Sequence, residues 1–403
     1  MVLELAILLL LALLFYAWVL YPLMLAAFMH GRKLSVSPGG RSAGPRSVAV
    51  LLAAYNEEDH IGVRLQNLVE TTAPLVAAGI PVEIHVGVDG STDRTAALAR
   101  DWAGRAPNIH THEFPVRRGK VSVLKELVQK VGADVVVFTD ANTFFHNDAL
   151  QRLLAPFRDA TVGGVCGRLV LRPREEKSST PPERSYWDWE ARLKEYESRL
   201  DSCLGANGAI YAIRRELFWR DIPNNTRVDD FVIGMKVREQ GRRLLYEPAA
   251  VAEEDLPDSR HEWRRRVRIG TGDYQALVFC RRCLLPRFGR FAWMFWSHKV
   301  LRWFTPHMVI AVALLAAVGV VFPSRTSRLP WLAPAVVCVL AAGLVTAWAG
   351  RLLEGAQWAR TRCFRPLGLW SHFVTMQLAL FAGFLKFCRG NLEGTWERTP
   401  RNG

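Results

Sequence analysis

Polar side chains that could bind a metal ion directly follow an apolar run. Asp140 and Asn142 stand two positions apart after the run Val135–Thr139. Two oxygen-bearing side chains at this spacing suit Mg²⁺ or Mn²⁺, which takes few protein ligands and completes its shell with water and substrate phosphates. The alternative is a turn in which Asp or Asn bonds its own backbone. The buried strand expected before them favours the metal site.

A second acidic segment follows the apolar run Val82–Val88. It reads Asp89-Gly90-Ser91-Thr92-Asp93. The Asp89 carboxylate could accept hydrogen bonds from a base or a ribose, whereas Thr92 or Asp93 could simply cap the next helix. The segment alone supports both interpretations equally.

Two basic segments could hold a diphosphate. Arg117-Arg118-Gly119-Lys120 opens an expected helix, whose amide groups together with Lys120 could attract a pyrophosphate. A solvated basic turn is an equal alternative. The second segment, Arg264–Arg268, is on its own most typical of a solvated or headgroup-facing charge run, but beside a donor site it could cover a diphosphate leaving group.

An acidic pair, Asp229 and Asp230, precedes an expected helix that continues to Glu239. Acidic residues at a helix N-terminus are ordinary partners of the helix dipole. The functional alternative is a general base that takes a proton from an acceptor hydroxyl.

The elements that must position these residues alternate along the chain. The sequence predicts strands at 47–54, 82–88 and 135–139, and helices at 57–68, 94–103 and 120–131. This alternation is typical of an α/β domain with a mainly parallel sheet flanked by helices. Ligands of such sheets bind beyond the carboxyl ends of the strands. The acidic segments after the second and third strands therefore meet where a phosphate and metal site is expected.

Four stretches contain no Asp, Glu, Lys or Arg: 5–31, 303–324, 329–350 and 366–385. Each is long enough for a membrane-crossing helix. The first begins after Glu4 rather than after basic residues, which favours an anchor over a secretory signal. Arg32 and Lys33 follow it directly, so the positive-inside rule predicts a multi-pass protein of the cell inner membrane with its large segment in the cytoplasm. The side of the C-terminus stays open.

The remaining segments complete the expected organisation. A transmembrane anchor at 1–31 precedes a linker at 32–46, a catalytic domain at 47–280, an amphipathic interface helix at 281–302, C-terminal membrane segments at 303–390 and a tail at 391–403. The interface helix is expected because arginines and aromatic residues are mixed in it. Net charge is +14, and much of the excess lies beside the membrane segments, which predicts contact with anionic lipids. No nucleic-acid module is present, so no nucleic acid is expected as a partner.

Taken in order, these motifs resemble family 2 glycosyltransferases of the bacterial membrane type, related to the synthases of cellulose, hyaluronan and poly-N-acetylglucosamine. The resemblance runs from about Val48 to Gly272. It is carried by Ala54-Tyr55-Asn56-Glu57, Asp89–Asp93, Arg118-Gly119-Lys120, Thr139–Asn142, Gly205-Ala206-Asn207-Gly208, Asp229-Asp230 and Arg265–Ile269.

The resemblance implies a GT-A fold with transmembrane helices at both ends, a nucleotide-sugar donor (by family habit a uridine diphosphate sugar) and Mg²⁺ or Mn²⁺. It also implies roles for individual residues. Those implied to bind the donor are Ala54, Tyr55, Glu57, Asp89, Lys120 and Asp140. Those implied to line the acceptor side are Asn207, Gly208 and Asp229; the metal would be held by Asp140 and Asn142, and Asp230, Arg265 and Arg268 would be catalytic.

The chain departs from the family pattern at two motifs. Asn142 stands where the metal motif often ends in Asp, and the Q-x-x-R-W motif of processive synthases reads Arg265-Arg266-Val267-Arg268-Ile269, which keeps only the arginine. We therefore expect an inverting transferase that acts on a lipid-linked or glycan acceptor at the cytosolic membrane face. A processive polysaccharide synthase is the first alternative. A non-catalytic membrane scaffold for glycan export is an alternative of another class.

Overall fold

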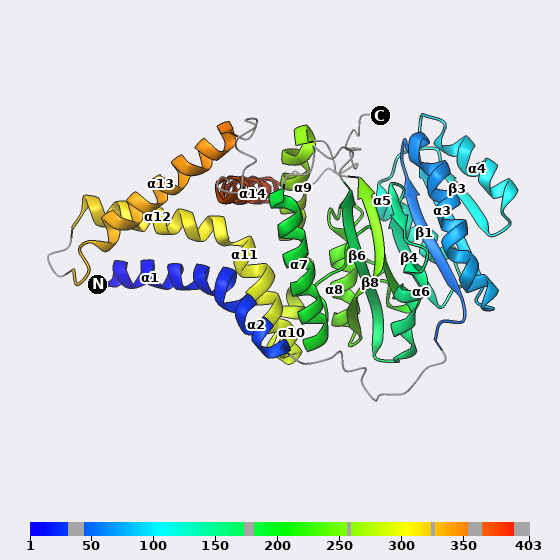
Figure 1. The fold of residues 1–403 in the computed structure, drawn as a ribbon, viewed down its shortest axis with the longest axis horizontal. Coiled ribbons are helices and arrows are strands. Elements are labelled where there is room, and N and C mark those ends of the chain that lie inside the picture. Colours follow the sequence, from blue (N-terminus) through cyan, green and yellow to red (C-terminus); the bar gives the residue numbers. More distant parts are fainter. Residues whose placement is uncertain (31–43, 173–180, 256–258, 324–326, 354–364, 391–403) are drawn as a thin grey trace.

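The computed structural model describes residues 1–30, 44–172, 181–255, 259–323, 327–353 and 365–390. An α/β domain lies on one side of the molecule and a group of long helices from both ends of the chain on the other (Figure 1). The strands are β1 (Val48–Ala54), β2 (Val82–Asp89), β3 (Ile109–Phe114), β4 (Val135–Asp140), β5 (Thr143–Phe145), β6 (Val162–Arg172), β7 (Tyr211–Arg214) and β8 (Arg243–Asp255). The helices of the domain are α3 (Glu58–Ala77), α4 (Thr95–Arg105), α5 (Lys120–Lys130), α6 (Ala149–Leu154), α7 (Pro181–Leu200), α8 (Asp229–Glu239) and α9 (Ser259–Phe279).

The described strands form one mixed sheet in the order β3-β2-β1-β4-β7-β6-β8-β5. Strands β3, β2, β1 and β4 are parallel neighbours, which confirms the α/β prediction for the first half of the domain. Strand β7 is antiparallel to both β4 and β6, and β5 is antiparallel to β8. The carboxyl ends of β1, β2 and β4 therefore share one edge of the sheet, as the sequence predicts.

Each face of the sheet is covered by its own helices. Side chains of α3 and α6 pack with alternate residues of β1, β2 and β4 in one apolar cluster, whereas α5 and α8 pack on the opposite face in another. Strand β1 is buried on both faces, as its unbroken apolar sequence requires.

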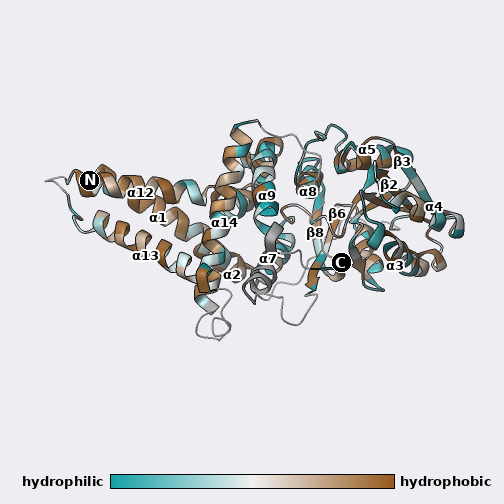
Figure 2. Ribbon diagram, turned by 90° about the horizontal axis from the view of Figure 1, so that it is seen from above, coloured by the Kyte–Doolittle hydropathy of each residue, from teal (hydrophilic) through white to brown (hydrophobic). Residues whose placement is uncertain are grey.

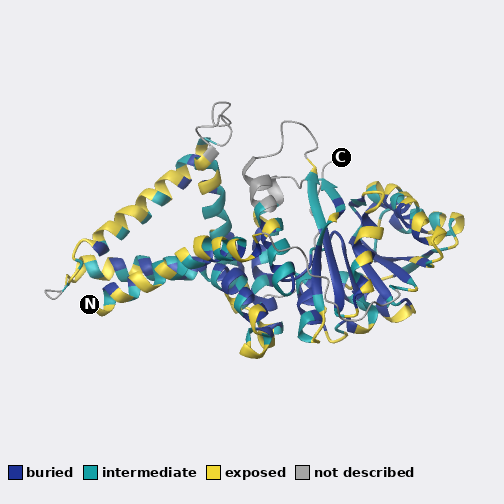
Figure 3. Cartoon of the chain, turned by 60° about the horizontal axis from the view of Figure 1, so that its bottom comes forward, coloured by how far each residue is buried: buried dark blue, intermediate teal, exposed yellow. Residues whose placement is uncertain are grey.

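Within the described residues, three helical segments are long and apolar enough to cross a membrane: Val2–Met29, Leu332–Leu353 (α13) and Pro366–Cys388 in α14 (Arg365–Cys388). The first comprises α1 (Val2–Phe15), the π-helical turn η1 (Tyr16–Leu20) and α2 (Tyr21–Met29). Figure 2 shows these helices as largely hydrophobic, and Figure 3 shows that many residues of α1 and α13 are exposed. Exposed apolar surface of this extent is typical of helices that face lipid.

The fourth apolar stretch predicted from the sequence, 303–324, lies mainly in α12 (Thr305–Val321). This helix follows the helical segment Arg290–Trp303 with a bend of 58° between them. Together the two helical segments are long and apolar enough to form one broken span or a re-entrant loop. The described residues therefore contain three candidate spans, or four if this bent pair is counted as a single span.

The segment predicted as one interface helix at 281–302 has a different local structure. Two 3₁₀ turns, η4 (Arg281–Leu284) and η5 (Pro286–Phe288), precede a helix that begins at Arg290. Gly289 lies between the second of these turns and the helix, and its φ is +53°. This left-handed backbone conformation, which glycine adopts readily, interrupts the chain between the turn and the helix. Phe291 and Phe295 are buried in the core cluster of the domain, so much of the aromatic face packs against protein. Its contact with a membrane surface stays a prediction.

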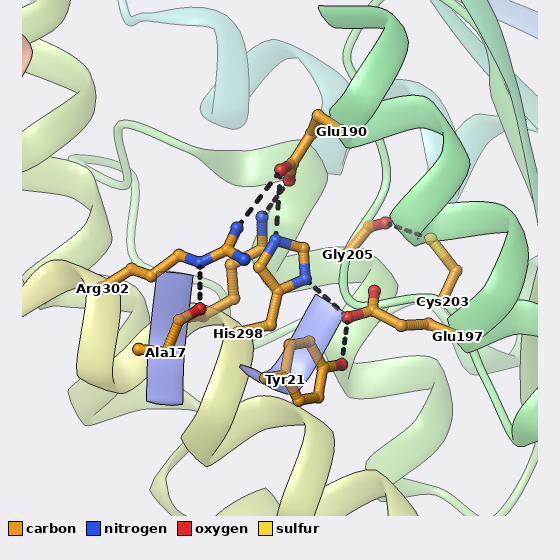
Figure 4. Close-up of polar contacts among 9 residues, drawn as sticks. Ala17, Tyr21, Glu190, Glu197, Cys203, Gly205, His298 and Arg302 are labelled. Atoms are coloured by element: carbon orange, nitrogen blue, oxygen red, sulfur yellow. Dashed lines mark hydrogen bonds and ion pairs between the residues drawn. The ribbon is translucent and has the colours of Figure 1, made fainter. Parts of the chain in front are cut away.

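A buried polar cluster joins the N-terminal helix to the α/β domain (Figure 4). His298 contacts Glu190 through Nε2 at 3.1 Å and Glu197 through Nδ1 at 2.5 Å. Tyr21 donates to Glu197 at 2.8 Å, and Arg302 donates to the carbonyl oxygen of a residue in η1 at 3.2 Å. Three segments far apart in sequence are thus fixed to one another: α2 with η1, α7, and the helix that starts at Arg290.

Glu190 lies between the basic side chains of this cluster. Its carboxylate also accepts a hydrogen bond from Lys299 at 2.5 Å and lies 3.9 Å from Arg302. Burial opposes the charged form, but His298 and Lys299 outweigh burial and hold the pKa of Glu190 well below its usual range.

We expect Glu190→Ala to lower the free energy of unfolding by about 3–5 kcal/mol, because it leaves buried cations without their anion. Thermal denaturation of the full chain in detergent measures this effect. The matched control is Glu195→Ala on the same helix, which removes a partly exposed pair with Arg199 worth about 0–1 kcal/mol. Equal effects of the two substitutions would contradict a central role for Glu190.

Candidate active site

The loops after β1 and β2 are hydrogen-bonded to each other at the carboxyl edge of the parallel strands. Asn56, with a φ of +53°, donates its backbone amide to Ser91 at 3.1 Å and accepts from the amide of Thr92 at 2.9 Å. The amide of Glu57 donates to Thr95 at 2.8 Å. These two loops, which the sequence predicts to bind a donor, therefore form one continuous surface at residues 54–57 and 89–95, and we call it the rim.

Asp89 fixes the loop before α5. This loop leads to Lys120, the lysine that is predicted to lie near the diphosphate. Its two carboxylate oxygens accept hydrogen bonds from the backbone amides of Arg118 and Gly119, both at 2.7 Å. Gly90 has a φ of +65°, and a Cβ there would lie 2.6 Å from the backbone nitrogen of Arg117. The turn thus requires glycine, and Asp89 orients the start of α5 as well as lining the rim.

The remaining residues predicted to bind a nucleoside lie beside this rim. The guanidinium of Arg117 stacks on the ring of Tyr55, 3.8 Å from its centroid. Glu57 is buried and lies 3.1 Å from His60. The side chain of Ala54 packs in the core, so this residue offers the rim only its backbone. Arg117 belongs to a segment that the sequence singled out, but its stacking depends on the fold.

Lys120, Asp140 and Asp230 converge on the space beside Gly208. The Lys120 ammonium donates to Asp140 at 2.7 Å. A Cβ on Gly208 would lie 3.3 Å from Asp140 Oδ2, 3.5 Å from Asp230 Oδ2 and 3.5 Å from Lys120 Nζ. Because Gly208 has no side chain, one cation and two carboxylates border the space where a Cβ would stand, and we call this space the cavity.

The acidic pair begins α8 and faces this cavity. Asp229 is buried, and its Oδ2 has no hydrogen-bond partner among the described residues, with the Lys120 ammonium 3.9 Å away. Burial raises the pKa of Asp229. Burial and the neighbouring charge of Asp229 raise the pKa of Asp230 to about 6, although Lys120 opposes this shift.

Lys120 stays charged in this environment. Burial disfavours its ammonium, but Asp140 and Asp229, with Asp230, outweigh burial and raise the pKa of Lys120. The side chain is therefore a fixed positive charge between three carboxylates.

The arginines predicted to be catalytic come from α9. Burial lowers the pKa of Arg268, as does the charge of Arg265, whereas Asp229 and Asp140 act in the opposite direction. Arg268 is thus within electrostatic range of the carboxylates around the cavity. Arg265 is bonded at 3.4 Å to Glu262, one turn earlier in the helix. The structure brings Arg268 to the site more directly than Arg265.

Two predicted site residues have their side-chain amides engaged elsewhere. Asn142 donates to Glu254 of β8 at 2.8 Å, which leaves its carbonyl oxygen as the possible metal ligand. Asn207 donates to the carbonyl of Gly167 at 2.8 Å and accepts from the amide of Ile210 at 3.2 Å. Asn207 therefore holds the loop that presents Gly208, and its binding of an acceptor stays a prediction.

Sequence reasoning missed two charged residues beneath and beside the cavity. Arg64 of α3 is fully buried and donates to Thr139 at 2.7 Å, next to Asp140. Asp273 of α9 has its pKa raised to about 8 by burial, with Lys299 opposing and Asp230 adding to the shift. The sequence did offer a signal for Arg64, which is an arginine on the apolar face of the predicted helix 57–68. The sequence offered no signal for Asp273, because its approach to Asp230 depends on how α9 packs in the fold.

The fold, with acidic and basic side chains gathered at the carboxyl ends of its parallel strands, is of the GT-A type. Residues 49–221 match the family model described as "Glycosyl transferase family 2". This segment is accordingly a family 2 glycosyltransferase domain, which confirms the resemblance carried by the sequence motifs.

Relatives and a solved structure agree with this assignment. The chain is similar to the poly-beta-1,6-N-acetyl-D-glucosamine synthase of Staphylococcus aureus (strain MSSA476), with 24% identity over 57% of this chain and 55% of the relative. It is similar to the hyaluronan synthase of Streptococcus pyogenes, with 28% identity over 58% of this chain and 51% of the relative. The chain therefore spans about half the length of these relatives.

Its fold is similar to that of the mannosyltransferase PcManGT from Pyrobaculum calidifontis, solved in complex with GDP-Man and Mn²⁺. The TM-score is 0.71 and the identity is 24%, and the match covers 96% of this chain and 99% of that one. This likeness includes the helices outside the catalytic domain, so the whole architecture has a solved counterpart.

Proposed function

We propose that this protein is an inverting glycosyltransferase that moves a sugar from a nucleotide diphosphate to a hydroxyl of a lipid-linked or glycan acceptor at the cytosolic face of the inner membrane. The observation that carries the proposal is the convergence of Lys120, Asp140 and Asp230 around Gly208. This convergence supports a general base, a diphosphate partner and a carboxylate for a cation acting at one place.

Asp230 is the general base of the proposed reaction. Its Oδ1 accepts a hydrogen bond from the amide of Phe231 at 2.8 Å, while its Oδ2 faces the cavity. A carboxylate with a pKa near 6 is a better base than an exposed one and is still ionised at neutral pH. It takes the proton of the acceptor hydroxyl as that oxygen attacks the anomeric carbon from the side opposite the leaving diphosphate.

Lys120 and Arg268 face the charge that develops on the leaving group. Both are fixed cations in a largely buried site, where such charges stabilise a transition state more than they would in water. Tyr55, Glu57 and Asp89 lie along the rim that continues from Lys120, in the position for the nucleoside.

The carboxylates fit a divalent cation. Asp140 Oδ2 borders the cavity, and the buried Asp229 Oδ2 accepts no hydrogen bond from any described residue, so hard oxygen ligands are available there. Asp140, with the carbonyl oxygen of Asn142, would hold Mg²⁺ or Mn²⁺. Such an ion, when bound, supplies positive charge to the diphosphate. The Mn²⁺ in the structure of the similar mannosyltransferase supports this proposal.

The acceptor decides between single transfer and polymer synthesis. Ile269 replaces the aromatic residue of the processive motif, which favours a short or lipid-linked product. The similar enzymes from Staphylococcus and Streptococcus are named as polysaccharide synthases, which favours processive synthesis as the second candidate. The apolar helices support a position of the cavity near a membrane in either case.

An acceptor assay tests the proposal. Purified full-length protein is incubated with radiolabelled nucleotide sugars and native lipid extract, and the label is followed into solvent-extractable lipid or into polymer. We expect label in the lipid fraction, and Asp140→Asn abolishes it. Label confined to long polymer would support the second candidate instead, and label in neither fraction would contradict sugar transfer to these acceptors.

The pH dependence of the reaction follows from Asp230. Because the base acts only when ionised and its pKa is about 6, we expect kcat/KM to rise about tenfold per pH unit below pH 6 and to level off above it. Asp229→Asn removes a charge that raises this pKa, so the inflection moves to lower pH. A pH profile of wild type that stays flat between pH 5 and 8 would contradict Asp230 as the base.

A further inference from the structure

A cluster of imidazoles lies on the outer strands of the sheet, away from the catalytic edge. His85 of β2 and His110 of β3 are direct neighbours across the parallel pair, and Glu83 lies two residues before His85 on the same face. His112 follows two residues after His110. The His85 ring centroid is 4.8 Å from that of His110 and 5.3 Å from that of His112.

Three of these side chains offer ligand atoms to a common point. One ligand atom each from Glu83, His85 and His110 lies within 4.8 Å of the other two. Ligand atoms on one tetrahedral zinc ion are roughly 3.4 Å apart, given zinc–nitrogen distances of about 2.1 Å. Glu83 is exposed and His110 is partly exposed, so small side-chain rotations close the remaining gap.

His112 gives the buried imidazole an orienting partner. His85 Nε2 is 3.2 Å from Glu83 Oε2, whereas His85 Nδ1 is 3.0 Å from His112 Nε2. If Nε2 binds a metal ion, Nδ1 carries the proton and donates it to His112. A metal-binding histidine commonly has such a hydrogen-bond acceptor on its second nitrogen, which fixes the tautomer and the ring plane.

The cluster is separate from the catalytic cavity. His85 precedes Asp89 by four residues on the same strand, which is roughly 13 Å at 3.3 Å per residue. Its ligand set differs too, because two imidazoles and one carboxylate favour zinc-like transition metals, whereas the carboxylates around Gly208 favour Mg²⁺ or Mn²⁺.

We propose that Glu83, His85 and His110 form a second metal site, which binds Zn²⁺ or a similar transition-metal ion and ties the edge strand β3 to β2. Three protein ligands leave a fourth position for water. The ion links neighbouring strands, so its binding adds a cross-strand tie at the edge of the sheet, where β3 pairs with β2 on one side and with no described strand on the other.

The test is a Zn²⁺ titration of the full chain, purified in detergent without a polyhistidine tag. Millimolar Mg²⁺ is present to occupy oxygen-rich sites, and Co²⁺ is used in parallel because its visible absorption reports nitrogen and oxygen coordination. We expect one equivalent of Zn²⁺ to bind and to raise the thermal midpoint. His110→Ala and Glu83→Gln each weaken binding by roughly 100-fold or more, and His112→Ala weakens it about 10–100-fold through the lost orienting bond.

Two controls make the result specific. His30→Ala removes an exposed histidine at the end of α2 and leaves binding unchanged. Sugar-transfer activity in Mg²⁺ also stays unchanged in His110→Ala, because this residue is outside the catalytic cavity. Equal Zn²⁺ affinity in wild type and in the His110 and Glu83 variants would overturn the proposal, as would the absence of any Zn²⁺-dependent shift of the thermal midpoint in wild type.

Discussion

Asp230→Asn is expected to reduce turnover by about 10²–10⁴-fold, the range associated with loss of general base catalysis. The amide has the shape of the carboxylate and can still accept the hydrogen bond from Phe231, so the start of α8 should be preserved. It cannot take a proton from the acceptor. Steady-state release of nucleotide diphosphate measures the loss, and titration with a nucleotide sugar shows that donor binding is retained.

The matched control for this substitution is Asp221→Asn, which changes an exposed aspartate in the same half of the domain. It should leave turnover within twofold of wild type. If Asp230→Asn has an intact fold and a rate near that of the control, Asp230 is not the base. The buried Asp229 would then be the first alternative to test.

Lys120→Met is expected to lower kcat by about 10²–10³-fold, because it removes a fixed cation from the position of the leaving diphosphate. The apolar stem keeps its length, but Asp140 loses its 2.7 Å hydrogen bond and the three carboxylates lose their common cation. Because Lys120 lowers the pKa of Asp230, the substitution should also move the inflection of the pH profile to higher pH.

Lys125→Met is the control on the same helix. Lys125 bonds the carbonyl of Ile222 and the side chain of Asn224, away from the cavity. Its substitution should change neither kcat nor the pH profile. A Lys120→Met enzyme with wild-type kcat and an unmoved profile would contradict the role of Lys120 at the diphosphate.

The donor half of the site was predictable from sequence because its residues directly follow predicted strands along the chain. Each of β1, β2 and β4 ends in a polar segment, and parallel strands bring such segments to one edge of the sheet. The gathering of these segments at one edge follows from that rule, whereas strand β3, the order of the strands and the contact of Lys120 with Asp140 do not. The function of Asp89 in fixing the loop before α5 did not follow, since it depends on the path of a backbone thirty residues away.

The acceptor half depended on contacts between distant segments. Strands β6, β7 and β8 mix parallel and antiparallel pairing, and α9 reaches Asp230 only through the fold. The approach of Asp273 therefore has no signal in the sequence pattern, and the acceptor-side position of Gly208 was implied only by the family resemblance. The break at Gly289 is also tertiary in origin, because a mixed run of arginines and aromatic residues fits both a surface helix and a packed turn.

The central claim is sugar transfer at the cavity around Gly208, and a donor screen tests it most directly. Full-length protein in detergent is mixed with a panel of nucleotide sugars, with native lipid extract as acceptor source, and release of nucleotide diphosphate is measured with and without Mg²⁺ or Mn²⁺. The account predicts release from at least one donor that requires the cation and falls by at least 100-fold in Asp230→Asn. Release that persists undiminished in Asp230→Asn, or folded protein that neither binds nor cleaves any donor, would contradict it.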